Sequence, residues 1–130
     1  MPTVIWTGVY ASVLAFVYVV LAVRVIRLRR GQGVAVGGGD EVLQRAIRAH
    51  ANFSEYVPLT LLLMFFAELS APSWVVHAAG ILLCLGRGVH AFGISQLREK
   101  FNQRAFGMAC TFTAMTGCAG TLLVMAISSI

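Results

Sequence analysis

Apolar residues fall into four long blocks along the sequence, and the stretches between them are polar or rich in glycine. About 20 consecutive apolar residues in a helix are enough to cross the hydrocarbon core of a bilayer. Because every block reaches that length, the pattern predicts four transmembrane helices. The predicted spans are residues 4–28, 42–69, 73–97 and 104–128.

The segments between the blocks carry signals for helix ends. The stretch GQGVAVGGG after the first block has no helical periodicity, and we expect a loop there. Asp40 is suited to cap the N-terminus of the second helix. Pro58 lies inside that helix and should kink it, while Pro72 is suited to the start of the third helix.

The short connections favour one simple arrangement of the four helices. With 130 residues, the chain has room for a single domain, residues 1–130. Two short connections and one of moderate length favour an up-down-up-down bundle, so the predicted fold class is an all-α integral membrane protein. Ala114, Gly117, Cys118 and Gly120 are small, and we expect them to allow close contact between the last helix and its neighbours.

Composition and charge agree with a membrane location. Hydrophobic residues make up 58% of the chain and charged residues 12%, about half the usual charged share. The net charge of +5 comes from basic residues that avoid both termini and the turn at 69–73. By the positive-inside rule, the two basic loops are cytoplasmic and both termini lie on the opposite side. This segregation argues against a nucleic-acid-binding domain, and the cysteine spacing does not predict a metal site.

Polar residues also occur at positions that the pattern places inside the membrane. Glu55 lies 14 residues before Leu69, and Arg87 lies 13 residues after Trp74, so both are about 20 Å from the turn between their helices. An unpaired charge at that depth would be costly, and equal depth on antiparallel helices therefore predicts an ion pair between Glu55 and Arg87.

Three more polar residues continue this line toward the cytoplasmic side. Asn52 and His90 lie one turn nearer that surface, and Arg48 lies a turn beyond them. Arg48, Asn52 and Glu55 have the spacing i, i+4 and i+7, so they share one face of a helix. One interpretation of this polar column is that it joins the helices; the other is a binding site for a zwitterionic, anionic ligand entering from the cytoplasm.

Several of these residues belong to stretches that resemble one known family. RAHANFSEYVPL in the second span contains the motif R-A-x-x-N-x-x-E-Y-x-P, GRGVHAFG lies in the third span, and an arginine opens the fourth. In this order they are similar to MAPEG, the membrane-associated proteins in eicosanoid and glutathione metabolism. The resemblance covers nearly the whole chain and is of the bacterial type, which implies a multi-pass inner-membrane protein.

The resemblance implies a homotrimer that binds glutathione, as a thiol co-substrate, between neighbouring protomers near the cytoplasmic side. It implies that one protomer holds the tripeptide and that a neighbour contributes further residues to it. It also implies that Arg104 activates the thiol and is the catalytic residue. The expected glutathione-binding residues are Arg48, Asn52, Glu55 and Tyr56 of one protomer, Arg27 and His50 of the neighbour, and His90 of the polar column.

The chain departs from the family pattern in two ways near the expected thiol. Where the eicosanoid branches carry tyrosines in the third span, this chain has His90 and Ile94. Where those branches tend to carry a proline three residues after the arginine of the fourth span, this chain has Gly107. The resemblance therefore implies thiol-tripeptide binding and leaves the identity of the lipophilic substrate open.

Three functions are consistent with these residues. The first is a membrane-bound glutathione-dependent transferase or peroxidase of the microsomal type, acting on a lipophilic electrophile in contact with membrane lipids. The second is a scaffold of the same family that binds a lipid or a thiol without doing chemistry. The third is a small multidrug exporter, which needs a carboxylate within the membrane; here the candidate, Glu55, lies beside arginines.

Overall fold

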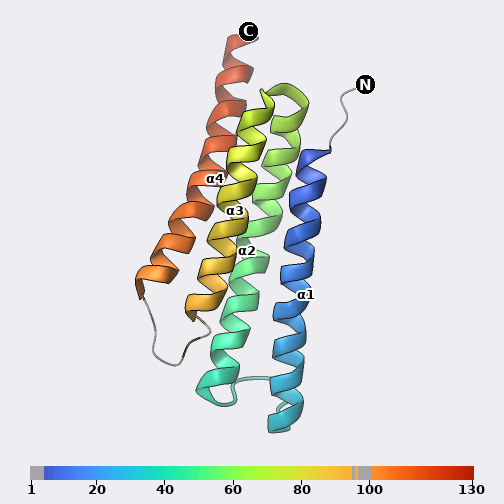
Figure 1. Cartoon of the computed structure of the whole chain (residues 1–130), viewed down its shortest axis with the longest axis vertical. Coiled ribbons are helices and arrows are strands. Elements are labelled where there is room, and N and C mark those ends of the chain that lie inside the picture. The colour runs from blue at the N-terminus through green and yellow to red at the C-terminus, as the bar shows by residue number, and fades with distance from the viewer. Residues whose placement is uncertain (1–4, 95, 97–100) are drawn as a thin grey trace.

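The computed structural model describes residues 5–94, 96 and 101–130, and all regular structure in this part of the chain is helical. Each of the four helices is long and apolar enough to cross a membrane, which confirms the four predicted spans. The predicted start of the first span, at residue 4, and the predicted end of the third, at residue 97, lie outside the described residues. The helices are α1 (Trp6–Gln32), α2 (Glu41–Ser70), α3 (Ser73–Ile94) and α4 (Phe101–Ser128) (Figure 1).

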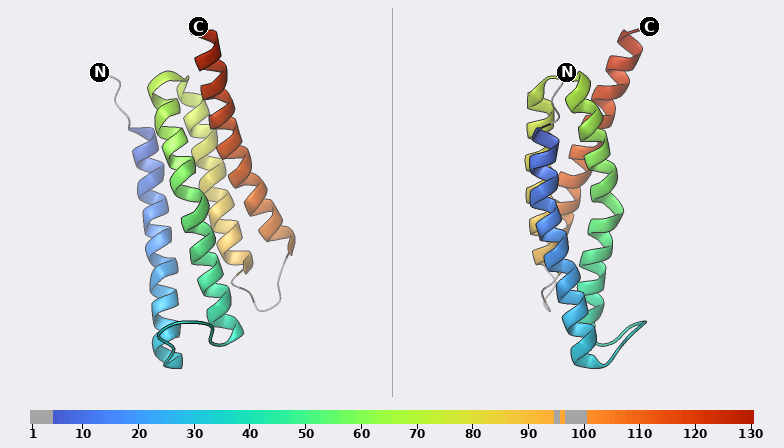
Figure 2. Two further views of the ribbon diagram at one scale, coloured as in Figure 1. Left: turned by 180° about the vertical axis from the view of Figure 1, so that it is seen from behind. Right: turned by 90° about the vertical axis from the view of Figure 1, so that its right-hand side faces the viewer.

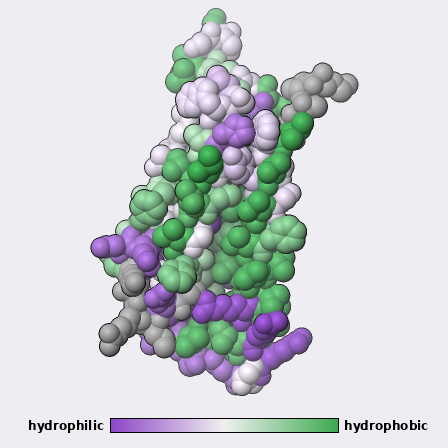
Figure 3. All heavy atoms as spheres, in the orientation of Figure 1, coloured by the Kyte–Doolittle hydropathy of each residue, from purple (hydrophilic) through white to green (hydrophobic). Residues whose placement is uncertain are grey.

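The helices lie side by side with alternating direction. α1 and α4 flank α2 and α3, and α1 makes no contact with α4 within the described residues. The start of α1 and the end of α4 lie at one end of the bundle, and the loop between α1 and α2 lies at the other (Figures 1 and 2). Apolar side chains cover much of the visible surface, whereas hydrophilic side chains gather at the end that carries the loop (Figure 3). We call this the loop end.

The helix boundaries at the loop end follow the expected local chemistry. Gly33 ends α1 with a φ of 65°, a left-handed conformation that glycine adopts without steric cost. The side chain of Asp40 accepts a hydrogen bond from the backbone N–H of Leu43 at 2.8 Å, which confirms it as the N-cap of α2. That bond, and one involving Gln32, hold the pKa of Asp40 below its usual value. α2 continues through Pro58 to Ser70.

The opposite end of the bundle is held together by a carboxylate on α2. Glu68 accepts hydrogen bonds from the backbone N–H groups of Ile5, Trp6 and Thr7 at 2.9, 2.7 and 2.7 Å. These N–H groups belong to the first turn of α1, where a helix has no internal acceptors and where its dipole favours a negative charge. A side chain of α2 therefore caps α1 and fixes where α1 begins.

α3 and α4 approach each other closely at Gly86 and Gly107. A Cβ added to Gly86 would lie 2.8 Å from the carbonyl oxygen of Gly107, and one added to Gly107 would lie 2.6 Å from the carbonyl oxygen of Gly86. By contrast, a Cβ on Gly117 or Gly120 would meet nothing within 4 Å. The expectation that these last two glycines make the close contact is therefore wrong for the single chain, because each of them has room for a side chain.

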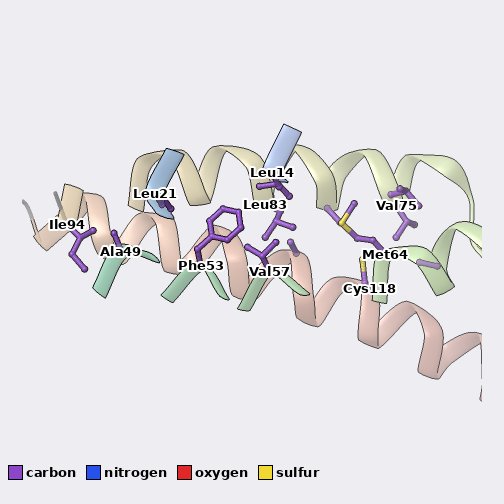
Figure 4. Packing of buried hydrophobic residues seen from close by; sticks show 14 residues of the cluster. Leu14, Leu21, Ala49, Phe53, Val57, Met64, Val75, Leu83, Ile94 and Cys118 are labelled. Atoms are coloured by element: carbon purple, nitrogen blue, oxygen red, sulfur yellow. The ribbon is translucent and has the colours of Figure 1, made fainter. Parts of the chain in front are cut away.

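Between the helices lies an apolar core that runs along the length of the bundle. Its side chains come from all four helices, with Leu14 of α1, Phe53 and Met64 of α2, Leu83 of α3 and Cys118 of α4 among them (Figure 4). Of the small residues expected at helix contacts, Ala114 and Cys118 are buried here. The polar residues Arg48, Asn52 and His90 of α2 and α3 lie outside this core, at the loop end of the bundle, where a cavity opens.

Candidate functional site

A cavity of about 450 Å³ opens at the loop end of the bundle, walled by α2, α3 and α4. Its lining is mostly polar, and it includes five of the residues that the sequence singled out: Arg48, Asn52, Glu55, His90 and Arg104. Four of the five residues of the polar column predicted from residue counting therefore line a cavity, and the fifth, Arg87, does not. The remaining lining residues are Glu41, Gln44, Arg45 and Ile94.

Helical periodicity explains how α2 builds one wall. Arg48, Asn52 and Glu55 share a face of α2, and Arg48 and Glu55 are exposed. Neither of these two side chains makes a hydrogen bond or an ion pair within the described residues. The one ion pair there joins Arg45 to Glu41 at 2.7 Å, one turn apart on the helix. A free guanidinium and a free carboxylate thus face the same space.

The lining residues that the sequence interpretation missed continue the same stripe of α2. Glu41, Gln44 and Arg45 lie one and two turns before Arg48, at the mouth of the cavity. The helical spacing that joins Arg48 to Asn52 also joins Gln44 to Arg48, so this signal was present in the sequence.

Arg87 has a different partner from the one expected. Its Nη1 donates to the side-chain oxygen of Asn52 at 2.6 Å and faces the backbone oxygen of Asn52 at 3.4 Å, and its Nη2 contacts the sulfur of Met108 at 3.3 Å. The predicted ion pair between Glu55 and Arg87 is wrong for this chain. Residue counting placed the two charges at equal depth, but Arg87 is 1% exposed whereas Glu55 is exposed beside the cavity.

His90 and Arg104 form the wall where α3 ends and α4 begins. His90 is 3% exposed, and its Nδ1 lies 3.4 Å from the backbone oxygen of Arg104. A carbonyl oxygen only accepts, so Nδ1 carries the hydrogen in this contact. Gly107 packs against the same residue, because a Cβ there would lie 2.6 Å from the Cβ of His90. Two of the departures from the family pattern, His90 and Gly107, therefore touch each other.

Three of the expected binding residues lie elsewhere in the single chain. The ring of Tyr56 packs edge-on against Phe112, with 5.4 Å between ring centroids. His50 stacks on Tyr18 of α1 at 4.7 Å, on a face of α2 that points away from the cavity. Arg27 lines a separate groove on α1, beside Arg24 and several valines. Of the residues expected from one protomer, all but Tyr56 thus line the cavity of a single chain. Arg27 and His50, which were expected from a neighbour, lie outside that cavity.

Four membrane-length helices with a polar cavity at one end define a multi-pass membrane protein. The sequence matches the MAPEG family over residues 7–124, and the chain belongs to that family. It is also 38% identical to the inner membrane protein YecN of Escherichia coli, in strain K12 and in strain CFT073. Each match extends over 122 residues, which is 92% of this chain and 88% of the relative. Together, these relatives and the four apolar helices support a multi-pass bacterial membrane protein.

The partner of Arg87 can be tested by comparing two substitutions on α2. Asn52→Leu keeps the branched shape of the side chain but leaves the buried guanidinium without its closest acceptor, and we expect the free energy of unfolding to fall by about 1.5–3 kcal/mol. Glu55→Gln should leave the melting temperature in detergent unchanged, because Glu55 is exposed and unpaired in the chain. A lower melting temperature for Glu55→Gln together with an unchanged one for Asn52→Leu would restore the ion pair first expected.

Proposed function

We propose that the protein is a glutathione-dependent transferase or peroxidase that acts on a lipophilic electrophile. The observation that supports this most is the composition of the cavity, which combines three arginines, two amides and two carboxylates. One of the carboxylates, Glu41, is paired with Arg45, and Glu55 is unpaired within the described residues. Glutathione carries two carboxylates, one ammonium group, two peptide bonds and a thiol. Arg48 suits a carboxylate, Glu55 suits the ammonium group and Asn52 suits a carboxylate or a peptide group. The volume lies within the roughly 300–1,000 Å³ typical of small-molecule sites.

The proposed orientation places the cavity on the cytoplasmic side. The basic residues of α1 and the start of α2 lie at the loop end, as the positive-inside rule requires of the cytoplasmic face. Both termini then lie on the opposite side. The thiol compound would enter from the cytoplasm, and the lipophilic substrate would reach the cavity from the surrounding lipid.

The proposed assembly is a homotrimer in which a neighbour completes the site. Arg27 lies on the outer face of α1, and His50 faces α1 rather than the cavity. If either side chain contacts bound glutathione, it must do so in another protomer. Native mass spectrometry of the protein released from detergent should therefore give a trimer. A monomer as the sole stable species would contradict a site shared between protomers.

Binding should depend on the geometry of Arg48 and not only on its charge. A guanidinium can donate two parallel hydrogen bonds to a carboxylate, whereas an ammonium group acts as a point charge. Arg48→Lys should weaken glutathione binding about tenfold, and calorimetry on the purified protein would measure it. Arg29→Lys is the matched control, because Arg29 bonds to loop carbonyl groups outside the cavity. Equal affinity for wild type and Arg48→Lys would count against direct contact.

The proposed chemistry assigns Arg104 to the thiol. A free thiol has a pKa near 8.5, so only a few per cent is ionised at pH 7. Lowering that pKa to about 6.5 would make most of the bound thiol a thiolate, the nucleophile of the reaction, and would require about 2.7 kcal/mol from the site. A guanidinium at the edge of the membrane, where the dielectric constant is low, can supply this amount.

Thiolate absorbance near 240 nm tests the role of Arg104. Adding glutathione to the wild-type protein at pH 7 should raise this absorbance, and Arg104→Ala should abolish most of the increase while Arg48→Lys only shifts its concentration dependence. The same signal in wild type and Arg104→Ala would mean that Arg104 is not catalytic. Binding without any thiolate signal in the wild type would favour the non-catalytic scaffold.

A further inference from the structure

We propose that Arg87 is a positioning residue for ligand recognition: it holds the side-chain oxygen of Asn52, so that the amide nitrogen of Asn52 donates into the cavity. The group recognised is a hydrogen-bond acceptor on the ligand, a carboxylate or a peptide carbonyl. This inference rests on the proposed function, because it takes glutathione as the ligand of the cavity. It assigns Arg87 a role in specificity although Arg87 does not line the cavity.

The orientation of the Asn52 amide follows from the chemistry of its partner. A guanidinium has only donors, so the atom of Asn52 that lies 2.6 Å from Nη1 of Arg87 must be the oxygen. The amide nitrogen then occupies the other branch of the side chain. It donates to no acceptor within the described residues and is not among their buried unpartnered atoms. Since Asn52 lines the cavity, its nitrogen is an accessible donor there.

The position of Arg87 is itself constrained from three helices. The residue belongs to α3, its Nη1 bonds to Asn52 of α2, and its Nη2 contacts the sulfur of Met108 of α4. It is 1% exposed, so the side chain has no solvent-filled space into which it could swing. The guanidinium that orients Asn52 is therefore fixed by packing.

The orientation decides which ligand group the cavity can bind. With its oxygen held by Arg87, Asn52 offers a donor to a ligand carboxylate, and the nearby cation polarises the amide and strengthens that donor. If the amide were free to turn over, its oxygen would face the ligand carboxylate and repel it. An asparagine side chain can both donate and accept hydrogen bonds. Arg87 thus leaves Asn52 with only a donor for the ligand, so the cavity favours a ligand group that accepts a hydrogen bond.

A double-mutant cycle on the glutathione dissociation constant separates this role from a structural one. Arg87→Met and Asn52→Ala should each weaken binding about tenfold, whereas the double variant should bind no more weakly than Asn52→Ala alone. Arg87→Lys, which keeps a donor, should recover part of the affinity. The control is Arg30→Met at the exposed end of α1, which should bind as the wild type does.

A second variant keeps the test independent of whether Arg87→Met folds. Asn52→Asp retains an acceptor for Arg87 but replaces the cavity donor with an acceptor. Its melting temperature should equal or exceed that of the wild type, and its glutathione affinity should fall below that of Asn52→Ala.

Three outcomes would overturn the inference. In one, the losses of Arg87→Met and Asn52→Ala multiply in the double variant, so that Arg87 does not act through Asn52. In another, Asn52→Asp binds glutathione as tightly as the wild type. In both cases the wild type still binds, so the proposed function survives. If the wild type does not bind glutathione at all, the proposed function fails and this inference fails with it.

Discussion

The bond between the buried guanidinium of Arg87 and the carboxamide of Asn52 is the interaction on which the polar end of the bundle depends. A charge enclosed by apolar helices is costly unless its donors are satisfied. Here the nearest acceptors are neutral: the carboxamide oxygen of Asn52 on α2 and the sulfur of Met108 on α4. Neither of them is a carboxylate. Of the two acidic residues of the cavity, Glu41 pairs with Arg45 and Glu55 is left unpaired within the described residues. The burial of Arg87 and the availability of Glu55 are thus two consequences of the same arrangement.

The contact between α3 and α4 places the other wall of the cavity. Gly86 and Gly107 let the two backbones approach closely, and this brings the start of α4, with Arg104, beside His90 at the end of α3. α1 takes no part in this wall. It is capped by Glu68 and linked by Tyr10 to His77 of α3, at the opposite end of the bundle. The face of α1 that carries Arg27 is consequently left for another protomer in the proposed trimer.

Much of this arrangement could be predicted from the sequence because the signals were local. Four apolar blocks gave the helices, Asp40 marked the start of α2, and a helical spacing on α2 located one wall of the cavity. Counting residues from a tight turn also gave useful depths in the membrane. It brought Asn52 and His90 to one level, and both line the cavity.

The errors came from rotation about the helix axes, which residue counting does not determine. Glu55 and Arg87 were placed at the same depth, but one side chain is exposed beside the cavity and the other is buried against Asn52 and Met108. In the same way, four small residues of α4 were expected at helix contacts, yet a Cβ on Gly117 or Gly120 would meet nothing within 4 Å, whereas one on Gly107 would meet α3. Facing directions depend on how two helices pack, and a single sequence carries little information about that.

The central claim is that glutathione occupies the cavity between α2, α3 and α4. The most direct test is a single-particle reconstruction of the protein with bound glutathione, at a resolution that shows side chains. The claim predicts density for the tripeptide beside Arg48 and Asn52, with its sulfur toward Arg104. A map in which the cavity is empty at saturating glutathione, or in which the tripeptide lies elsewhere on the protein, would contradict it.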